Sequence, residues 1–591
     1  MLAAIMATGS FTAHAQDAKN LARSFFYARQ VQHPTLSPSG KKMAYVLRSR
    51  KQDWLWVHDI ETSASRAYEQ KNEIRIKRLD WLDDNTLAYD NWRQATTYLA
   101  YNLLNLRRQS TIKIEDQGKV LQIVHPLPFK QGQAIAKFPS SNELYTLDAR
   151  SGELTTLLRT KEPFNQIIVD SYGTPRLGKI EGDEPSFFAS SLDKWEPLET
   201  PESLQDLAIV DAGSTLLATH LEDSHFVVSL HDFPSLKSRN QRYVHDGYDV
   251  APDAYIRNNL THAIAGFRYQ ADKPTYAWID AEYQQWHETL SAYMPGMNIE
   301  ILGTDTSKRH VSAFASADNQ PGHLFVLDTE DERIQTIRYS GPLLDPEELP
   351  RTMPFYFSNR NGQRVHGYIT LPQDPYKKPF PLIVIARDGP QGRNTWGYDP
   401  QNLYFAKLGF AVIKVDYHGS TGYGQTHADL PLHKILELSV QDCADAARWA
   451  IQHGFADAQK VGIYGEGFGG YVALASLAAE QNLYQCAVGF GGIYDWNKHL
   501  DETSNDLAPR YKLLSPINSA ESFNAAALLI HSQSDKKVSP DQSRAMHQAL
   551  RREGKDSALS LTNWQPHTHL SPDSAYALYL RLATFYASEL K

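Results

Sequence analysis

The segment with the clearest chemical signature spans residues 461–471 and has the sequence Val-Gly-Ile-Tyr-Gly-Glu-Gly-Phe-Gly-Gly-Tyr. An apolar run enters a glycine-rich turn, and an alanine-rich helical stretch leaves it. A strained strand–turn–helix of the G-x-S-x-G type lifts its central serine above a sheet, where it can act as the nucleophile of acyl transfer. The central position here is Gly467, so the turn is present without its oxygen. Gly465 and Gly469 remain where small residues let strand and helix approach closely.

The same glycines also fit a second motif. Gly465-x-Gly467-x-x-Gly470 matches the G-x-G-x-x-G pattern of dinucleotide-binding loops. That pattern opens a nucleotide-binding domain and requires an acidic residue at the end of a following strand. Here the segment lies in the C-terminal part of the chain and no fitting acidic residue follows, so the nucleophile turn is favoured.

The elements around this turn predict an α/β domain. Residues 380–385 and 410–415 are nearly continuous apolar runs, which is typical of strands buried on both faces. Helical stretches at 440–453 and 471–480 alternate with such runs. Alternating strands and helices predict a doubly wound, mostly parallel sheet over residues 350–591.

The N-terminal part has a different pattern, in which short alternating runs are broken by Gly, Pro, Asn and Asp. Runs such as 42–46, 144–147 and 323–327 are long enough for strands and too short for stable helices. Several share a frame in which a strand ends in aspartate and a tight turn leads into a second strand. Such loosely repeated hairpins predict a β-propeller, with a large β-sandwich as the alternative.

These two patterns predict two domains. A chain of 591 residues is too long for one hydrophobic core. We place the β-propeller at 24–345 and the α/β domain at 350–591. The boundary is expected in the proline-rich stretch 342–354.

The bulk composition excludes several kinds of partner. The net charge of −9 is spread along the chain, so there is no electrostatic footprint for nucleic acid. Cys443 and Cys486 lie in apolar surroundings and are expected to be buried free thiols, which cannot form a four-ligand zinc site alone. We therefore predict no metal and no cofactor.

Residues 1–15 predict a signal for export. They form a short apolar stretch that ends in Ala13-His14-Ala15, a small-x-small cleavage pattern before Gln16. A frayed apolar N-terminus is the alternative. From this signal we expect a periplasmic location. We expect no membrane span, because no other apolar run approaches the ~20 residues needed to cross a bilayer.

Several stretches together resemble the prolyl oligopeptidase family of serine peptidases, nearest to its acylaminoacyl-peptidase-like and dipeptidyl-peptidase-like branch. Residues 381–390, ending in Arg-Asp-Gly-Pro, resemble the family's apolar strand followed by His-Gly-Gly-Pro. Residues 415–424 resemble its Asn-Tyr-Arg-Gly-Ser-Thr-Gly-Tyr-Gly segment. The resemblance covers nearly the whole chain. It implies a β-propeller, seven-bladed by analogy, followed by an α/β-hydrolase domain.

The resemblance also implies where a catalytic triad would lie. Gly467 stands at the position of the serine nucleophile. The strand and loop at residues 528–535 resemble the segment that presents the triad aspartate, which gives that role to Asp535. The histidine role falls on His567, with His569 as the second choice.

Four departures from the family pattern cluster around this site. A carboxylate at position 388 would repel a developing oxyanion in a hole to which the Phe468 amide contributes. The departures are Gly467 for the serine, Arg387-Asp388 for the His-Gly that helps supply an oxyanion-hole amide, His418 for an arginine, and Ser532 for a glycine. Together they predict that catalysis has been lost.

The sequence therefore predicts a non-catalytic, exported relative of these peptidases that binds short peptides in the cleft between propeller and hydrolase. Members of the family occur in several oligomeric states, which leaves the formation of a homo-oligomer open. Three alternatives stay open. One is an active peptidase or esterase, with a natural serine at 467 or a displaced nucleophile. Another is a structural partner subunit. The third is metal-assisted hydrolysis through His418, His567, His569 and Asp535.

Overall fold

The computed structural model of the chain describes residues 16–590 except 72, 94–96, 115–117, 128, 131, 140, 183–184, 192–193, 202–203, 259–260, 306, 342–343, 501–505 and 565–569. The expected export signal at residues 1–15 and both candidate histidines, His567 and His569, lie outside the described residues. Two compact units are present. One contains residues 29–317 and 321–341, and the other contains the N-terminal residues up to 28 together with 318–320 and 342–591.

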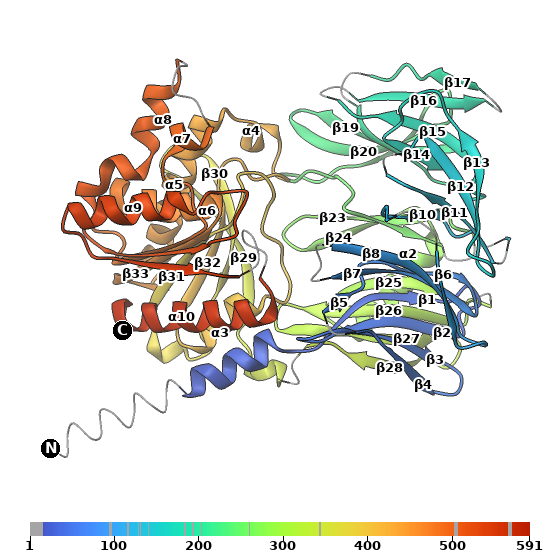
Figure 1. Ribbon diagram of the computed structural model, residues 1–591, viewed down its shortest axis with the longest axis horizontal. Helices are drawn as coiled ribbons and strands as arrows, with labels where there is room; N and C mark the ends of the chain where they lie inside the picture. Colours follow the sequence, from blue (N-terminus) through green and yellow to red (C-terminus); the bar gives the residue numbers. More distant parts are fainter. Residues whose placement is uncertain are drawn as a thin grey trace. The chain divides into compact units, whose positions relative to one another are not determined.

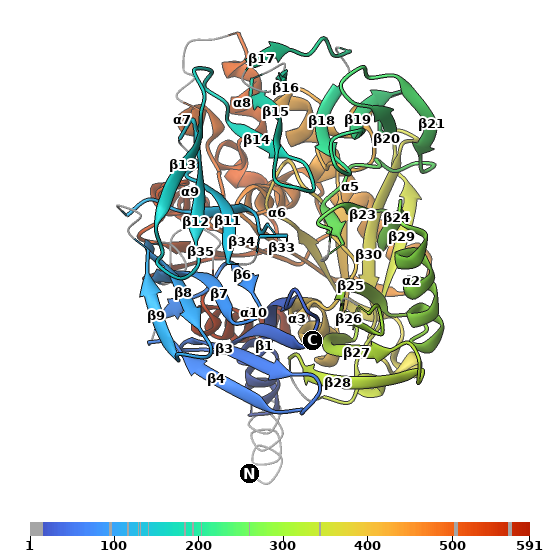
Figure 2. The same cartoon turned by 90° about the vertical axis from the view of Figure 1, so that its right-hand side faces the viewer.

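The first unit is a seven-bladed β-propeller, which confirms the predicted fold and excludes the β-sandwich. Its described residues form seven small antiparallel sheets, each made of strands consecutive in the chain, and Figure 2 shows these sheets arranged in a ring. Helix α2 (Ala281–Tyr293) lies between the sixth and seventh sheets in the sequence.

The strands of the seven blades follow one another along the chain. The first three blades contain β1 (Gln30–Leu36), β2 (Lys42–Arg48), β3 (Asp53–Asp59), β4 (Ser65–Glu69); β5 (Ile74–Arg75), β6 (Leu79–Asp83), β7 (Thr86–Arg93), β8 (Thr97–Asn105), β9 (Ser110–Lys113); β10 (Gln122–His125), β11 (Gln133–Lys137), β12 (Glu143–Asp148) and β13 (Leu154–Arg159). The other four contain β14 (Gln166–Val169), β15 (Pro175–Ile180), β16 (Ser186–Ser191), β17 (Lys194–Pro197); β18 (Leu204–Ile209), β19 (Thr215–Glu222), β20 (His225–Asp232), β21 (Ser238–Tyr243); β22 (Ala254–Arg257), β23 (Ile264–Gln270), β24 (Pro274–Trp278); β25 (Asn298–Thr304), β26 (His310–Ala317), β27 (Gln320–Asp328) and β28 (Arg333–Tyr339).

Burial along these strands explains the blade architecture. The second strand of a blade is buried on both faces, as in β2 and β19, because each blade packs against a neighbour on either side. The last strand is largely exposed and polar, as in β4 and β21. The sequence pattern of apolar and polar runs therefore repeats once per blade.

The ring closes through side-chain packing, because each of the seven sheets contains only strands consecutive in the chain. Val31 and Met43 of the first blade share a buried apolar cluster with Leu324 and Val326 of the last. A tight turn before β2 brings the two backbones together at Gly40, where an added Cβ atom would lie 2.1 Å from Cβ of Asp305.

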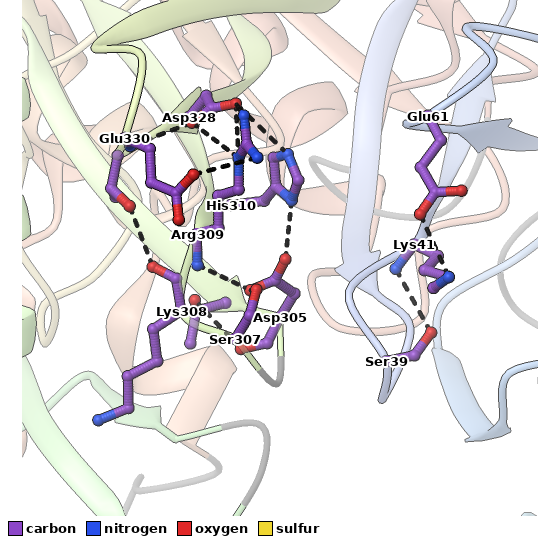
Figure 3. A network of polar contacts seen from close by, with 12 residues as sticks. Ser39, Lys41, Glu61, Asp305, Ser307, Lys308, Arg309, His310, Asp328 and Glu330 are labelled. Carbon is purple, nitrogen blue, oxygen red and sulfur yellow. Dashed lines mark hydrogen bonds and ion pairs between the residues drawn. The ribbon is translucent and has the colours of Figure 1, made fainter.

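A polar cluster adjoins this seam (Figure 3). Nδ1 of His310 donates to Oδ2 of Asp305 over 2.7 Å, and the Arg309 guanidinium forms an ion pair with Asp328 at 2.8 Å. On the side of the first blade, Lys41 pairs with Glu61 at 3.2 Å. The charges at this edge are thus matched within each blade.

The second unit is an α/β-hydrolase fold, as predicted. Its eight-stranded sheet has the order β29-β30-β32-β31-β33-β34-β35-β36, in which the first two strands are antiparallel to their neighbours and the rest are parallel. The strands are β29 (Thr352–Ser358), β30 (Arg364–Thr370), β31 (Phe380–Ala386), β32 (Ala411–Asp416), β33 (Ala456–Glu466), β34 (Cys486–Phe490), β35 (Ala526–Ser532) and β36 (Ser557–Thr562).

Helices cover both faces of this sheet (Figure 1). α5, α6 and α9 contribute to the apolar core on one face, whereas α3 and α10 contribute to the core on the other. The helices are α3 (Pro400–Lys407), α4 (Gln425–Ala428), α5 (Leu432–Gln452), α6 (Phe468–Ala479), α7 (Trp496–Leu500), α8 (Ala508–Leu514), α9 (Asp541–Arg552) and α10 (Pro572–Leu590), with 3-10 turns at Pro346–Glu348, Pro375–Lys377 and Pro516–Ser522.

An N-terminal helix at residues 16–26 belongs to the hydrolase unit. It buries Ala22 and Phe25 in the core beside α3 and α10, and Phe26 stacks on Tyr579 with ring centroids 4.4 Å apart. The propeller unit therefore begins at Arg29, rather than at the residue 24 expected from the sequence. None of the helices in the described part of the chain is long and apolar enough to cross a lipid bilayer.

Candidate functional site

The glycine-rich turn at the end of β33 has the strained conformation expected of a nucleophile turn. Gly467 lies between β33 and α6 with φ +52° and ψ −118°, a region that residues with side chains rarely adopt. Its amide donates to the carbonyl of Phe490 on the neighbouring strand over 2.9 Å. The apex of the turn is thus fixed by the sheet at the carboxyl ends of the parallel strands.

Two further glycines allow α6 to rest directly on the backbone of the sheet. A Cβ atom on Gly465 would lie 1.9 Å from the carbonyl oxygen of Gly469. A Cβ atom on Gly469 would lie 2.0 Å from the carbonyl oxygen of Ala386 and 2.5 Å from that of Arg387. No side chain fits at either place, which is the close strand–helix approach predicted for these positions.

The side chain of Asp388 occupies the space in front of this turn. Its Oδ1 accepts hydrogen bonds from the amide of Phe468 at 2.8 Å and from the amide of Gly389 at 2.9 Å. A Cβ atom on Gly467 would lie only 2.1 Å from the same oxygen. The carboxylate therefore fills the place of a side chain at position 467. It also takes up the first free amide of α6, where the helix dipole favours an anion.

The expected oxyanion-hole residues are thus brought together, but not in the expected way. The sequence placed Phe468 and Asp388 around the hole. In the structure the second amide comes from Gly389, and Asp388 contributes its carboxylate as the acceptor. Two convergent backbone amides are the donors that stabilise a developing oxyanion. Here they already hold a negatively charged oxygen.

The side chain of the neighbouring Arg387 fixes the loop that carries Asp388 through hydrogen bonds. The guanidinium donates to three backbone carbonyls, each over 2.6 Å, and to Oγ of Ser420 over 2.8 Å. The three carbonyls belong to Asp388, Pro390 and Gln391. Because one rigid fork binds four acceptors, the loop has little freedom to turn the carboxylate of residue 388 away.

Asp535 lies in the loop after β35 with its carboxylate buried. Its Oδ1 accepts from the amides of Lys537 at 2.9 Å and Val538 at 3.0 Å, and its Oδ2 lies 3.5 Å from Nε2 of His531. The side chain of Lys537 extends to Asp388, with Nζ 3.8 Å from Oδ2. The triad roles assigned to Asp535 and Gly467 stay predictions, because His567 and His569 lie outside the described residues.

His418 belongs to a separate buried network. Its Nδ1 lies 2.7 Å from Oδ2 of Asp442, which also accepts from the backbone amide of His418 at 2.9 Å. The other oxygen of Asp442 accepts from Nδ2 of Asn359 at 2.9 Å. Within the described ranges, no group of three or more His, Cys, Asp or Glu side chains is arranged to hold a metal ion. The geometry of His418 is therefore that of a structural histidine.

A second buried histidine beside this network predicts acid sensitivity. Burial, together with the neighbouring His418, lowers the pKa of His427 from 6.5 to about 4. Its Nε2 donates to the carbonyls of Asp416 at 3.1 Å and Tyr417 at 3.2 Å. The folded protein keeps this ring neutral, so the unfolded chain binds a proton first as the pH falls.

The contribution of His427 to stability is therefore complete above pH 6.5 and is lost towards pH 4. In this window the free energy of unfolding should fall by about 1.4 kcal/mol per pH unit because of this group. The variant His427→Gln, which retains a donor, should show a shallower slope in urea unfolding between pH 6.5 and pH 4.5. The same substitution at the exposed His453 should leave the slope unchanged. An equal slope in native protein and His427→Gln would contradict the assignment.

Comparison with known proteins is consistent with this geometry. Residues 396–591 match the Prolyl oligopeptidase family. The dipeptidyl aminopeptidase BIII of Pseudoxanthomonas mexicana is 26% identical over 212 residues, which cover 35% of this chain and 31% of that protein. The prolyl endopeptidase FAP of Mus musculus is 27% identical over 316 residues, which cover 51% of this chain and 39% of that protein. The matches thus span about a third of the length of these curated relatives.

Solved structures show the same fold over nearly the whole chain. A puromycin-hydrolyzing peptidase of Mycobacterium tuberculosis superposes with a TM-score of 0.71 at 16% identity, covering 97% of this chain and 96% of that one. A prolyl endopeptidase superposes with a TM-score of 0.72 at 13% identity, covering 98% and 93%. The similarity to the Prolyl oligopeptidase family thus lies in residues 396–591, within the hydrolase unit.

Proposed function

We propose that this protein is a prolyl oligopeptidase-family member that has lost serine-peptidase catalysis and retains the binding of short peptides. The observation that carries the first half is the carboxylate of Asp388, which accepts from the amides of Phe468 and Gly389 in front of a turn without a side chain. The second half is supported by the names of the relatives, which are peptidases. Peptide binding does not require a serine nucleophile, so it can be retained when catalysis is lost.

Two independent defects argue against acyl transfer. The first is the missing nucleophile, since loss of a triad serine lowers kcat by about 10⁶, or roughly 8 kcal/mol of barrier. The second is the occupied amide pair. An oxyanion that formed beside Gly467 would have to displace the Asp388 carboxylate or suffer its repulsion, and loss of a single oxyanion-hole donor costs about 10²–10³ in kcat.

Neighbouring oxygens do not replace the missing hydroxyl. Oγ of Ser420 accepts from the Arg387 guanidinium and so lies beneath the loop. Burial raises the pKa of Glu466, whose carboxylate accepts from the hydroxyl of Tyr464 at 2.5 Å. Oγ of Ser532 donates to the carbonyl of Trp564 over 2.8 Å. Each of these groups is engaged elsewhere.

The native protein tests both halves of the proposal. On a panel of chromogenic aminoacyl and peptidyl substrates we expect no turnover above the uncatalysed rate. The variant Asp535→Asn serves as the control, because any true residual triad activity would fall in it while a contaminant's activity would not. Turnover that is lost in Asp535→Asn would overturn the inactive assignment.

Peptide binding is measured separately by calorimetry with a library of short peptides. We expect dissociation constants in the micromolar range for at least one class of peptide sequence. Such a constant corresponds to a binding free energy of about −8 kcal/mol. If no peptide in a broad library binds, the binding half of the proposal fails and the role of a structural partner subunit gains support.

Export to the periplasm, proposed from residues 1–15, is tested by fractionating cells that produce the full chain.

A further inference from the structure

The two oxygens of the Asp388 carboxylate lie in different surroundings. Oδ1 is held by the amides of Phe468 and Gly389. Oδ2 faces the ammonium group of Lys537 at 3.8 Å, and the aspartate side chain is 31% exposed. A small molecule can therefore reach this carboxylate, while the loop beneath it is fixed by Arg387. A fixed, partly exposed carboxylate beside a pair of amide donors combines a nucleophilic group with donors for a developing oxyanion.

We propose that Asp388 is a displaced carboxylate nucleophile for small neutral alkyl electrophiles, of which epoxides are the type. Carboxylates serve as covalent nucleophiles in hydrolytic enzymes. The inference rests on the proposed function, because only a glycine at 467 leaves room for this side chain. A Cβ atom there would lie 2.1 Å from Oδ1 and 2.5 Å from Cγ of Asp388.

The first chemical step is alkyl transfer to Oδ2. A lone pair of Oδ2 forms a bond to an epoxide carbon, the ring carbon–oxygen bond breaks, and its electron pair goes to the ring oxygen. That oxygen takes a proton from water or from the Lys537 ammonium. The product is a hydroxyalkyl ester of Asp388, whose carbonyl oxygen is Oδ1 and remains between the two amides.

The second step is hydrolysis of that ester. Water adds to Cγ and gives up a proton to solvent, and the negative charge develops on Oδ1. The amides of Phe468 and Gly389 already lie 2.8 and 2.9 Å from this oxygen, as an oxyanion hole requires. Collapse of the intermediate breaks the Cγ–Oδ2 bond, and Oδ2 leaves with the diol and takes the proton of the added hydroxyl group as the carboxylate re-forms. The net reaction is epoxide plus water to diol.

The same geometry excludes peptides as substrates of this nucleophile. Attack on an amide would place the new oxyanion on the substrate, whereas the two amide donors are occupied by Asp388 itself. At a saturated carbon no oxyanion forms in the first step, so the occupied hole is no obstacle. Anionic electrophiles are disfavoured by the charge of the carboxylate. The chemical class that fits is a small, uncharged epoxide or alkyl halide.

Covalent labelling of the native protein tests the nucleophile. After brief exposure to 1,2-epoxy-3-(4-nitrophenoxy)propane at neutral pH and acid quenching before the ester hydrolyses, peptide mapping should show modification of Asp388 at least about tenfold faster than modification of Asp541, because the Asp388 carboxylate is fixed near the Lys537 ammonium, which can protonate the opening epoxide oxygen. Asp541 is the internal reference, since its side chain is 63% exposed at the start of α9. The variant Asp388→Asn should lose only the fast label. Equal rates at both aspartates would overturn the proposal.

A single turnover in water enriched in ¹⁸O tests the second step. We expect one ¹⁸O atom in the carboxylate of Asp388 and none in the first molecule of diol, because water attacks Cγ and the diol carries Oδ2. The label in the diol, with Asp388 unlabelled, would mean direct attack by water and would overturn the covalent route. Peptide turnover by the native protein is a separate result that bears on the proposed function alone.

Discussion

Introducing a serine at position 467 alone is expected to leave the protein inactive. The variant Gly467→Ser should hydrolyse p-nitrophenyl acetate at least about 10²-fold more slowly than the double variant Gly467→Ser with Asp388→Gly. The reason is steric and electrostatic, since a Cβ atom at 467 would lie 2.1 Å from Oδ1 of Asp388, whose charge also occupies the two amides. Glycine at 388 removes both obstacles and introduces the residue that the family pattern has there.

The two single variants are the controls for this experiment. Asp388→Gly alone has free amides but no nucleophile, so it should hydrolyse the ester no faster than the native protein. If Gly467→Ser alone matches the double variant, the carboxylate moves aside readily and the account of the blocked hole is wrong. Rates measured across the four proteins under one set of conditions decide between these results.

A large effect on stability is expected from a substitution at Gly469. The variant Gly469→Ala should lower the free energy of unfolding by about 4 kcal/mol or prevent folding, because its Cβ atom would lie 2.0 Å from one backbone oxygen and 2.5 Å from another. Backbone atoms of β31 and its following loop cannot yield as a flexible side chain can. The whole of α6 would have to move away from the sheet.

The adjacent glycine of the same helix provides the matched control. In Gly470→Ala the added Cβ atom would meet nothing closer than 2.9 Å, so a smaller loss of about 1–2 kcal/mol is expected. Both variants gain the same helix propensity, and the difference between them isolates the close approach. Equal unfolding free energies in urea titrations would show that α6 does not rest on the sheet as described.

Much of the fold was predictable from the sequence, because periodicity reports burial directly. Continuous apolar runs marked the parallel strands, and short alternating runs marked the propeller. The helix expected at 440–453 begins earlier in the structure, at Leu432. Ile435 and Leu436 extend its buried face towards the N-terminus, whereas the polar His433 and Lys434 beside them obscured this extension in the sequence. The seven blades came from the resemblance, since the repeats themselves are too irregular to count.

The site was predictable in its positions but not in its contacts. The turn at Gly467 was recognisable because a strand, a set of closely spaced glycines and a helix follow one another in the chain. The carboxylate of Asp388 in the amide pair was not, because it depends on a loop conformation fixed by Arg387. The signal was present as a charged pair where the family pattern has His-Gly, but sequence alone could not say where the charge points.

The most direct test of the central claim is labelling of the native protein with a fluorophosphonate, which reacts with activated serine nucleophiles in a free oxyanion hole. We expect no label on the native chain, because Gly467 offers no hydroxyl and the Asp388 carboxylate occupies the two amides. The double variant Gly467→Ser with Asp388→Gly is the positive control, expected to be labelled at position 467. Stoichiometric labelling of the native protein, mapped to any serine of the hydrolase unit, would contradict the account.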